Sequence, residues 1–222
     1  CTLDLGGHTI TGPMGRSQCV IVETNTAVTI RGEGEITTPY GIALTVNGSV
    51  TLEGGTYTSG GSESSSVHVM GESAMLSVTG EKVSIRNTSG GYGLIVAQAQ
   101  SVRLSAGTYS GTAGAISSTV KLSDMLAHTD NIRYAFYQDS NPYTPSGSSL
   151  PGGTFTVQEC EHDGITPTSN NDGTHALKCP YCGYSEAAAN CTYVFSGTTG
   201  TCVACKDSVT VAVSGTDNLI YD

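Results

Sequence analysis

The sequence contains no Trp and only 3 Phe among 222 residues, and charged residues make up 13% of it. No apolar run reaches the length of about 18 residues that a membrane-spanning helix needs, so we expect no membrane insertion. The 9 Lys and Arg are scattered and the formal net charge is −10, which argues against a nucleic-acid partner. What is abundant is Gly, with 29 residues, which favours short strands and turns over helices.

Two phrases of the first half of the chain recur. YGIAL at 40–44 returns as YGLIV at 92–96, and VTLEGGTY at 50–57 returns as VRLSAGTY at 102–109. Related segments lie midway, so the repeat is about 21 to 26 residues long, which is typical of a solenoid. A β-sandwich would also give many short strands, but it would not repeat whole phrases at a fixed period. The spacing leaves no room for helices between strands.

The repeat predicts two series of strands. The first series starts near Leu3, Val28, Val50, Leu76 and Val102. The second series starts near Cys19, Gly41, Val67, Gly93 and Ala115. Apolar and polar residues alternate within each strand, so like residues of successive coils should stack. We expect an interior ladder of Ile30, Leu52, Val78 and Leu104. Four tyrosines (Tyr40, Tyr57, Tyr92 and Tyr109) are expected at corners, as covers of the ladders or as a stripe that contacts carbohydrate or protein.

Six of the 8 cysteines lie between 160 and 205, together with two of the 5 His. The candidate metal ligands are Cys160, His162, His175, Cys179, Cys182, Cys191, Cys202 and Cys205. Each C-x-x-C pair places two thiolates on one side of a tight loop, and eight such ligands suit two tetrahedral zinc ions with no open position. Closed zinc sites are structural, so we expect folding chemistry here. The few large apolar residues of this segment also favour metal stabilisation.

Two groupings of these eight ligands are open. The local grouping, which we prefer, places Cys160, His162, Cys179 and Cys182 on one ion, and His175, Cys191, Cys202 and Cys205 on the other. A crossed grouping would join the two C-x-x-C pairs on one ion. Three disulfides or free thiols are the alternatives to zinc, since an extracellular protein can form disulfides. Cys1 and Cys19 are expected as small buried apolar residues, with a bridge between them as the alternative.

Several segments resemble a known family. TLDLGGHTI at 2–10, VTIRG at 28–32 and GGTY at 54–57 resemble the β-helix repeats of large adhesin-like surface proteins of gut Firmicutes. LSDMLA at 122–127 with YAFY at 134–137 is similar to a phrase that follows those repeats. CEH at 160–162 and CPYCG at 179–183 resemble the short Cys/His repeats that come next, although Tyr193 stands where the second copy would have His, and His175 is recruited in its place.

The repeat, the ligands and the resemblance together define our expectations. We expect an all-β fold, with a right-handed parallel β-helix followed by a small zinc-ribbon-like Cys/His domain. The expected divisions are 1–137 for the β-helix with an end cap, 138–156 for a linker, 157–208 for the Cys/His module and 209–222 for a tail or the start of another element. A single helical turn at 122–127 should cover one end of the β-helix.

The resemblance implies a secreted, non-enzymatic module of the bacterial cell surface. It would serve as a rigid stalk or adhesin segment within a longer protein, and its partners would be host or microbial glycans or proteins. A lipoprotein that begins at Cys1 is less favoured, since no flexible linker follows.

Enzymatic chemistry has little support in the sequence. The outward positions of the first strand series carry Asp4, Thr29, Thr51 and Arg103, without the paired carboxylates that glycoside hydrolysis needs. Glu33 and Glu35 lie in a corner beside Arg31, and His8, His68 and His128 are isolated. We therefore expect no catalytic residues. The alternatives are a fragment of a pectate-lyase-like, carbohydrate-active enzyme and a carbohydrate-binding module.

Overall fold

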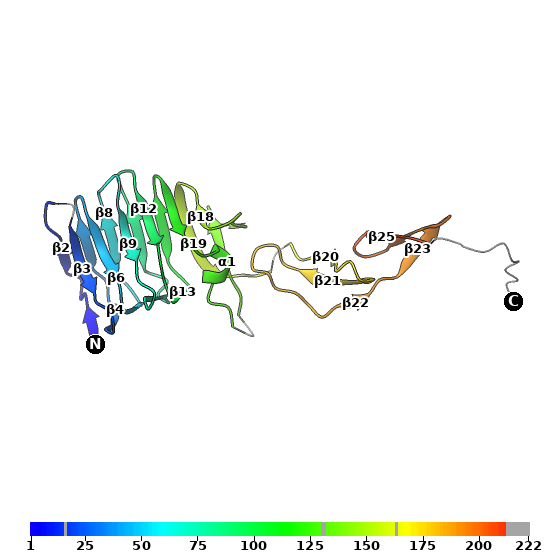
Figure 1. Cartoon of the computed structure of the whole chain (residues 1–222), viewed down its shortest axis with the longest axis horizontal. Helices are drawn as coiled ribbons and strands as arrows, with labels where there is room; N and C mark the ends of the chain where they lie inside the picture. The colour runs from blue at the N-terminus through cyan, green and yellow to red at the C-terminus, as the bar shows by residue number, and fades with distance from the viewer. Residues whose placement is uncertain (16, 130–131, 163, 212–222) are drawn as a thin grey trace, which may run out of the picture. The chain divides into compact units, whose positions relative to one another are not determined.

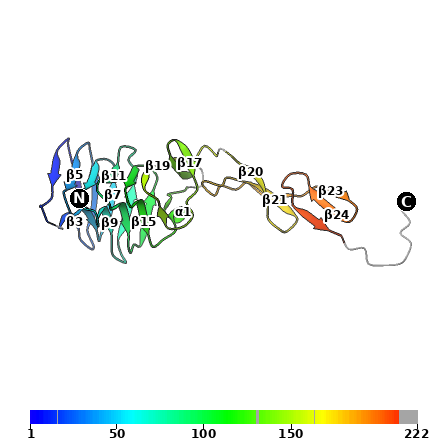
Figure 2. The same cartoon turned by 90° about the horizontal axis from the view of Figure 1, so that it is seen from above.

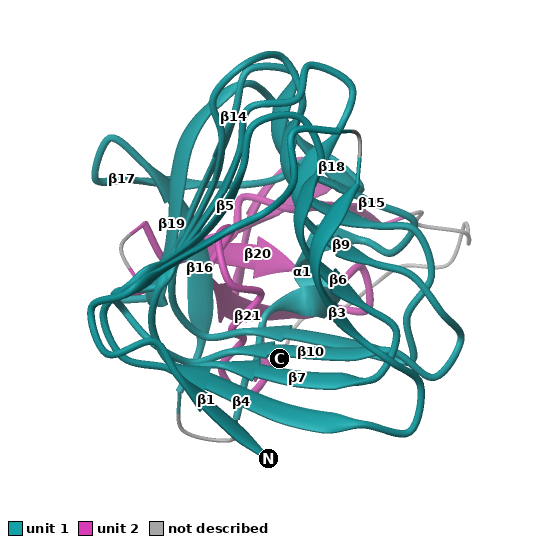
Figure 3. Ribbon diagram, turned by 90° about the vertical axis from the view of Figure 1, so that its left-hand side faces the viewer, with its two compact units in different colours: residues 1–161 teal, residues 162–222 magenta. Residues whose placement is uncertain are grey.

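The computed structural model describes residues 1–15, 17–129, 132–162 and 164–211. The chain divides into two compact units, residues 1–161 and residues 162–222 (Figure 3). No helix of the described residues is long and apolar enough to span a membrane. Most of the segment 209–222, expected as a tail or a new element, lies outside the described residues.

The first unit is a parallel β-solenoid of about five turns, built from three sheets that we name A, B and C (Figures 1 and 2). Sheet A contains β1 (Thr2–Asp4), β4 (Ala27–Arg31), β7 (Ser49–Leu52), β10 (Met75–Val78) and β13 (Ser101–Leu104). The parallel part of sheet B contains β2 (Thr9–Thr11), β5 (Glu35–Thr38), β8 (Thr56–Ser59), β11 (Ser84–Asn87) and β14 (Thr108–Gly111). Sheet C contains β3 (Gln18–Val22), β6 (Ile42–Val46), β9 (Ser65–Val69), β12 (Tyr92–Val96) and β15 (Gly114–Ser118).

Sheets A and C are the two strand series that the repeat predicts, and the solenoid is confirmed. The expected interior ladder is also confirmed. Ile30 pairs with Leu52, Leu52 with Val78, and Val78 with Leu104, and all four side chains are fully buried. Burial of a side chain of this size is worth about 1.5–3 kcal/mol, so each coil is held to the next mainly by stacked hydrocarbon.

Sheet B was not among the expected series, because two of its strands were interpreted as corners. Tyr57 in β8 and Tyr109 in β14 point into the core and are fully buried, in register with Ile85 of β11 between them. Each phenol donates a hydrogen bond to a backbone carbonyl, of Gly54 at 3.0 Å and of Ala106 at 2.9 Å. The expectation of a corner position is therefore wrong for both tyrosines.

One end of the solenoid is covered by a cap. The helix α1 (Leu122–Met125) buries Leu122 and Met125, and Leu126 forms a parallel bridge with Leu104. The short lid expected at 122–127 is thus confirmed. Antiparallel strands complete the cap, namely β16 (Tyr134–Gln138), β17 (Asn141–Tyr143), β18 (Ser149–Leu150) and β19 (Gly153–Glu159).

The segment 138–156, expected as a linker from its Pro, Gly and Ser content, contributes to this cap. Phe155 of β19 pairs with Tyr109, and Leu150 of β18 pairs with Ile116, and both apolar side chains are buried. The many polar residues around Phe155 and Leu150 gave no sign that these two side chains would be buried. Both shield the last coil from water. The boundary between the compact units lies after residue 161.

The second unit contains two small antiparallel sheets. One sheet consists of β20 (Thr166–Ser169), β21 (Thr174–Lys178) and β22 (Ala189–Asn190). The other consists of β23 (Tyr193–Ser196), β24 (Thr199–Cys202) and β25 (Ser208–Thr210). Among the described residues of this unit, the buried apolar ones are Ala176, Cys179, Cys182 and Cys202. Three of these four are candidate metal ligands.

Candidate metal centres

The eight candidate ligands gather in two groups of four. Cys160, His162, Cys179 and Cys182 form the first group, which we call site 1. His175, Cys191, Cys202 and Cys205 form the second group, site 2. Within each group every residue offers one ligand atom, and these atoms all lie within 4.8 Å of one another. This is the local grouping that the sequence favours, and the crossed grouping of the two C-x-x-C pairs is not found.

The distances between ligand atoms fit a tetrahedral metal ion. Sulfur ligands about 2.3 Å from a common zinc ion, at tetrahedral angles, lie roughly 3.8 Å from one another, and a nitrogen ligand lies slightly nearer. In site 2 the Sγ atoms of Cys191 and Cys205 are 3.7 Å apart, and the Cys191 Sγ lies 3.6 Å from the His175 Nδ1. In site 1 the Cys182 Sγ lies 3.3 Å from the His162 Nδ1. The donor set, three sulfurs and one imidazole nitrogen at each site, is typical of structural zinc.

The backbone explains why the two C-x-x-C pairs present their thiols in the same way. After each pair the chain enters the left-handed region, with φ of 70° at Gly183 and 62° at Lys206. The N–H of Gly183 donates to the Cys179 carbonyl at 3.2 Å, and the N–H of Lys206 donates to the Cys202 carbonyl at 3.1 Å. Both loops therefore form the same tight turn, although the second carries a side chain where glycine is favoured.

A second pair of hydrogen bonds repeats in the two loops. The Cys179 N–H donates to the Tyr184 carbonyl at 2.9 Å, and the Cys202 N–H donates to the Asp207 carbonyl at 2.7 Å. The two halves of the unit are also joined directly, because the Ser169 hydroxyl donates to the Asp207 carboxylate at 2.6 Å. The unit thus contains two metal-binding loops of matching backbone structure.

The thiols of site 2 affect one another's ionisation. Desolvation raises the pKa of Cys191, and shared hydrogen bonds with the Cys202 and Cys205 thiols raise it further, to about 12. Desolvation also acts to raise the pKa of Cys202, but the Cys205 N–H and the two neighbouring thiols stabilise its thiolate more strongly, and its pKa falls to about 7. Crowded thiols of this kind ionise together only when a cation compensates their charge.

Disulfides were the main alternative to metal at these positions. An S–S bond requires sulfurs about 2.05 Å apart, and the 3.7 Å between Cys191 and Cys205 is far longer. Cys191, Cys202 and Cys205 are all thiols in the structure. Cys1 is exposed and Cys19 is half-buried, and both are free. The expectation that both are buried is wrong for Cys1, because it lies at the outer edge of sheet A.

Two tyrosines near the sites were not identified as functional from the sequence. The Tyr184 ring stacks on the His162 imidazole with centroids 4.4 Å apart, which holds this ligand in place. Tyr193 lies beside Cys191, and desolvation together with this thiol raises the pKa of its hydroxyl to about 12. Tyr193 therefore stays protonated and can donate to a Cys191 thiolate. The sequence offered one signal for Tyr193. It lies two residues after Cys191, as His162 lies two residues after Cys160.

Three carboxylates of the solenoid lie next to basic side chains. Asp4 lies opposite Arg31, two residues away from the expected pairing with Thr29, and forms an ion pair with it at 3.1 Å. The Glu33 carboxylate pairs with Lys82 at 2.7 Å. The Glu35 carboxylate lies 3.5 Å from Arg86 and accepts a hydrogen bond from the Thr58 hydroxyl. These contacts are those of a solvated structural surface.

Comparisons with known proteins give no further guidance, since no family model, no curated protein and no solved structure matches the chain.

Proposed function

We propose that this chain is a non-enzymatic structural module of a bacterial cell surface. The β-solenoid provides a rigid support, and a zinc-stabilised module of about 50 residues follows it. In this proposal the module belongs to a longer secreted protein and acts as a stalk or adhesin segment, with host or microbial glycans or proteins as partners. The single observation that carries the metal part is the pair of four-ligand groups at tetrahedral spacing.

Closed coordination supports a structural role for the metal. Each group supplies three sulfurs and one nitrogen, which leaves no position for a water molecule or a substrate. Catalytic zinc keeps such a position open. The second unit also has few buried apolar side chains, and small units of this kind usually depend on a metal or disulfides. Zinc would therefore supply folding free energy to this unit.

The rigid-support part of the proposal rests on the solenoid. Stacked strands in register, with a continuous interior ladder, resist bending and present repeated outward positions. A carbohydrate-active enzyme remains the second candidate of the sequence, but the carboxylates described above pair with Arg or Lys. The structural module is the better explanation of both units.

Metal content of the purified chain tests the proposal directly. We expect two equivalents of zinc per chain by mass spectrometry of the native protein and by elemental analysis. The Cys1→Ser variant is the matched control and should keep both ions, because Cys1 is exposed and outside both sites. A chain that contains no metal after expression in zinc-supplemented medium, with its cysteines in disulfides, would overturn the zinc assignment.

A further inference from the structure

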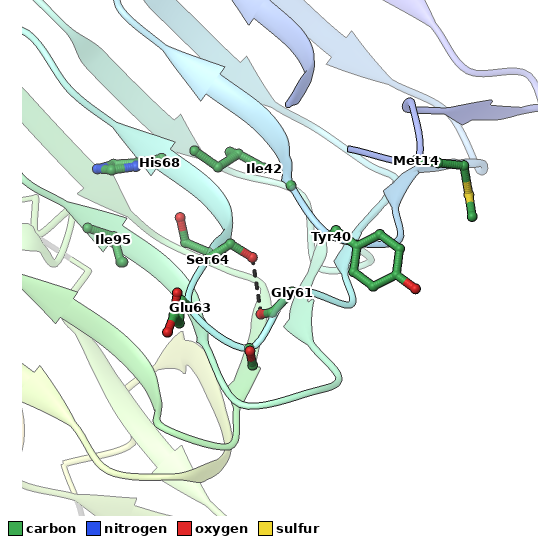
Figure 4. A pocket seen from close by; sticks show the side chains of 11 residues that line it. Met14, Tyr40, Ile42, Gly61, Glu63, Ser64, His68 and Ile95 are labelled. Carbon is green, nitrogen blue, oxygen red and sulfur yellow. Dashed lines mark hydrogen bonds between the residues drawn. The ribbon is translucent and has the colours of Figure 1, made fainter. Parts of the chain in front are cut away.

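The outer face of sheet C carries a pocket that the metal chemistry does not use. Its volume is about 410 Å³, with Met14 and Tyr40 at one end and His68 and Ile95 at the other (Figure 4). The Ser65 Oγ and His68 Nε2 atoms beside it are buried from solvent, so they offer a ligand no contact. Basic side chains at the capped end of the solenoid carry the inference instead.

Two arginines at this end stand out by their lack of a carboxylate partner. Arg31 and Arg86, in other coils, pair with Asp4 and with Glu35. Arg103 and Arg133 form no ion pair within the part of the chain that the structure describes. Carboxylates outnumber basic groups in a chain with a formal net charge of −10, so two unpaired guanidinium groups are unexpected.

Arg133 lies beside His128. The His128 Nδ1 accepts a hydrogen bond from the N–H of Tyr134 at 3.1 Å, and Arg133 is the residue before Tyr134. This hydrogen bond also holds the imidazole ring in place. A neutral ring that accepts at Nδ1 carries its proton on Nε2, so His128 has an Nε2–H donor in the neighbourhood of Arg133.

Arg103 approaches the same place from sheet A. It is an exposed, outward residue of β13, a strand that contacts α1 of the cap (Figure 1). The next residue, Leu104, forms a parallel bridge with Leu126, two residues before His128. Burial lowers the pKa of His128, and the charges of Arg133 and Arg103 lower it further, so both guanidinium groups lie near the imidazole.

This combination of donors matches an oxyanion. A guanidinium group can donate two parallel N–H bonds to a carboxylate, sulfate or phosphate, and a neutral imidazole adds one more donor. The charge of the whole chain limits the anion, because a formal net charge of −10 repels a polyanion. The ligand that fits both facts has a single negative group on an otherwise neutral molecule.

We propose that Arg103, Arg133 and His128 bind the carboxylate or sulfate group of an acidic glycan. A terminal acidic sugar or a sulfate ester brings one negative charge on a neutral glycan, whereas an acidic protein segment usually brings several. The inference rests on the adhesive role proposed above and gives it a site and a charge preference. It is independent of the metal content of the second unit.

Calorimetry with matched lactose derivatives and the full chain tests the charge preference. The probes are sialyllactose and sulfated lactose, with lactose as the neutral control and inorganic sulfate as the anion alone. We expect at least one charged lactose to bind at millimolar concentration and lactose to fail. Inorganic sulfate should bind at least about tenfold more weakly than the better glycan, because it lacks the sugar contacts. Added salt should weaken binding.

Variants without the charge locate the site. With the better charged probe, Arg103→Gln and Arg133→Gln should each weaken binding at least about tenfold. Arg103→Lys should restore only part of the affinity, since an ammonium group cannot form the paired bonds. The matched control is Arg31→Gln, which removes an arginine from sheet A that pairs with Asp4, and it should bind like the natural chain.

Two further measurements keep the test independent of variant folding. Circular dichroism spectra of all variants establish that the solenoid is folded. Titration of the natural chain with the better probe, followed by heteronuclear NMR, should shift the backbone amides of Arg103, His128 and Arg133 and leave those of sheet C unchanged.

The outcomes separate the site from the general adhesive role. Equal binding by the natural chain, Arg103→Gln and Arg133→Gln would overturn this site and leave the adhesive role in place. The inference would also be overturned if lactose or inorganic sulfate bound as tightly as the charged glycans, if neither charged lactose bound at millimolar concentration, or if hexaglutamate were preferred. Absence of binding to a glycan array and to host proteins would overturn the adhesive role as well.

Discussion

The two units of this chain bury different kinds of side chain. In the solenoid the largest fully buried side chains are hydrocarbon and aromatic, stacked coil upon coil, as with Leu52 and Tyr109. In the second unit the most buried side chains are cysteines of the candidate metal sites, and Val194 and Phe195 lie exposed. The first unit therefore has a core that excludes water. The second has few buried apolar side chains and contains seven of the eight candidate metal ligands.

This difference predicts how each unit should fail. Loss of one interior side chain should lower the free energy of unfolding of the solenoid without unfolding it, because the remaining coils still stack. Loss of one ligand should unfold the module, because little else is buried there. Stability of the two units should therefore respond to different changes, and the predictions below run from the largest expected effect to the smallest.

Removal of a metal ligand should have the largest effect. We expect Cys179→Ser to lose the ion of site 1 and Cys205→Ser to lose the ion of site 2, each reducing zinc from two equivalents to one and disordering its half of the module. The double variant should bind none. Native mass spectrometry and heteronuclear NMR spectra measure both effects. If Cys179→Ser and Cys202→Ser removed the same single ion, the crossed grouping would be correct.

An interior substitution in the solenoid should have an intermediate effect. Leu52→Ala removes a fully buried side chain from the middle of the ladder and should lower the free energy of unfolding by about 2–5 kcal/mol. The outward neighbour Thr51→Ala is the control and should change it by less than about 0.5 kcal/mol. Urea unfolding monitored by circular dichroism gives both values. Equal effects of the two changes, or loss of zinc from Leu52→Ala, would contradict the separation of the units.

Substitutions in the turns after the two C-x-x-C pairs should change stability by less, and in opposite directions in the two turns. Gly183 has φ of 70° and open space where a Cβ would lie, so Gly183→Ala should cost about 1–2 kcal/mol through backbone strain alone. Lys206 has φ of 62°, and Lys206→Gly should stabilise its turn by about 0.5–1 kcal/mol. Competition with a zinc chelator measures both changes. If Gly183→Ala stabilised the module, the left-handed conformation assigned to Gly183 would be contradicted.

The sequence predicts the solenoid because its repeat is long and its interior is apolar. Ile30, Leu52, Val78 and Leu104 recur at nearly constant spacing, and each can share an interior position only if coils stack. Sheet B was not predicted, because Tyr57 and Tyr109 carry a polar hydroxyl group and come shortly after Gly-Gly or Ala-Gly, which are typical of corners. Only the structure shows that their hydroxyl groups reach the carbonyl groups of Gly54 and Ala106 inside the core.

The ligands were predictable because cysteine and histidine at these spacings have few other uses. Their grouping was open from the sequence, since chain order alone does not state which loops face each other. The pocket on sheet C could not be predicted. It depends on which coil corners stack on one another, and Met14, Tyr40 and Ile95 come from three different coils.

Hydrogen exchange with and without a metal chelator tests the central contrast most directly. Mass spectrometry of peptides from the whole chain would follow the backbone amides of both units in one sample. We predict that exhaustive chelation leaves the amides of sheets A, B and C protected and exposes those of β20 to β25 to rapid exchange. Unchanged protection of β20 to β25 after complete removal of metal, or parallel loss of protection in both units, would contradict the account.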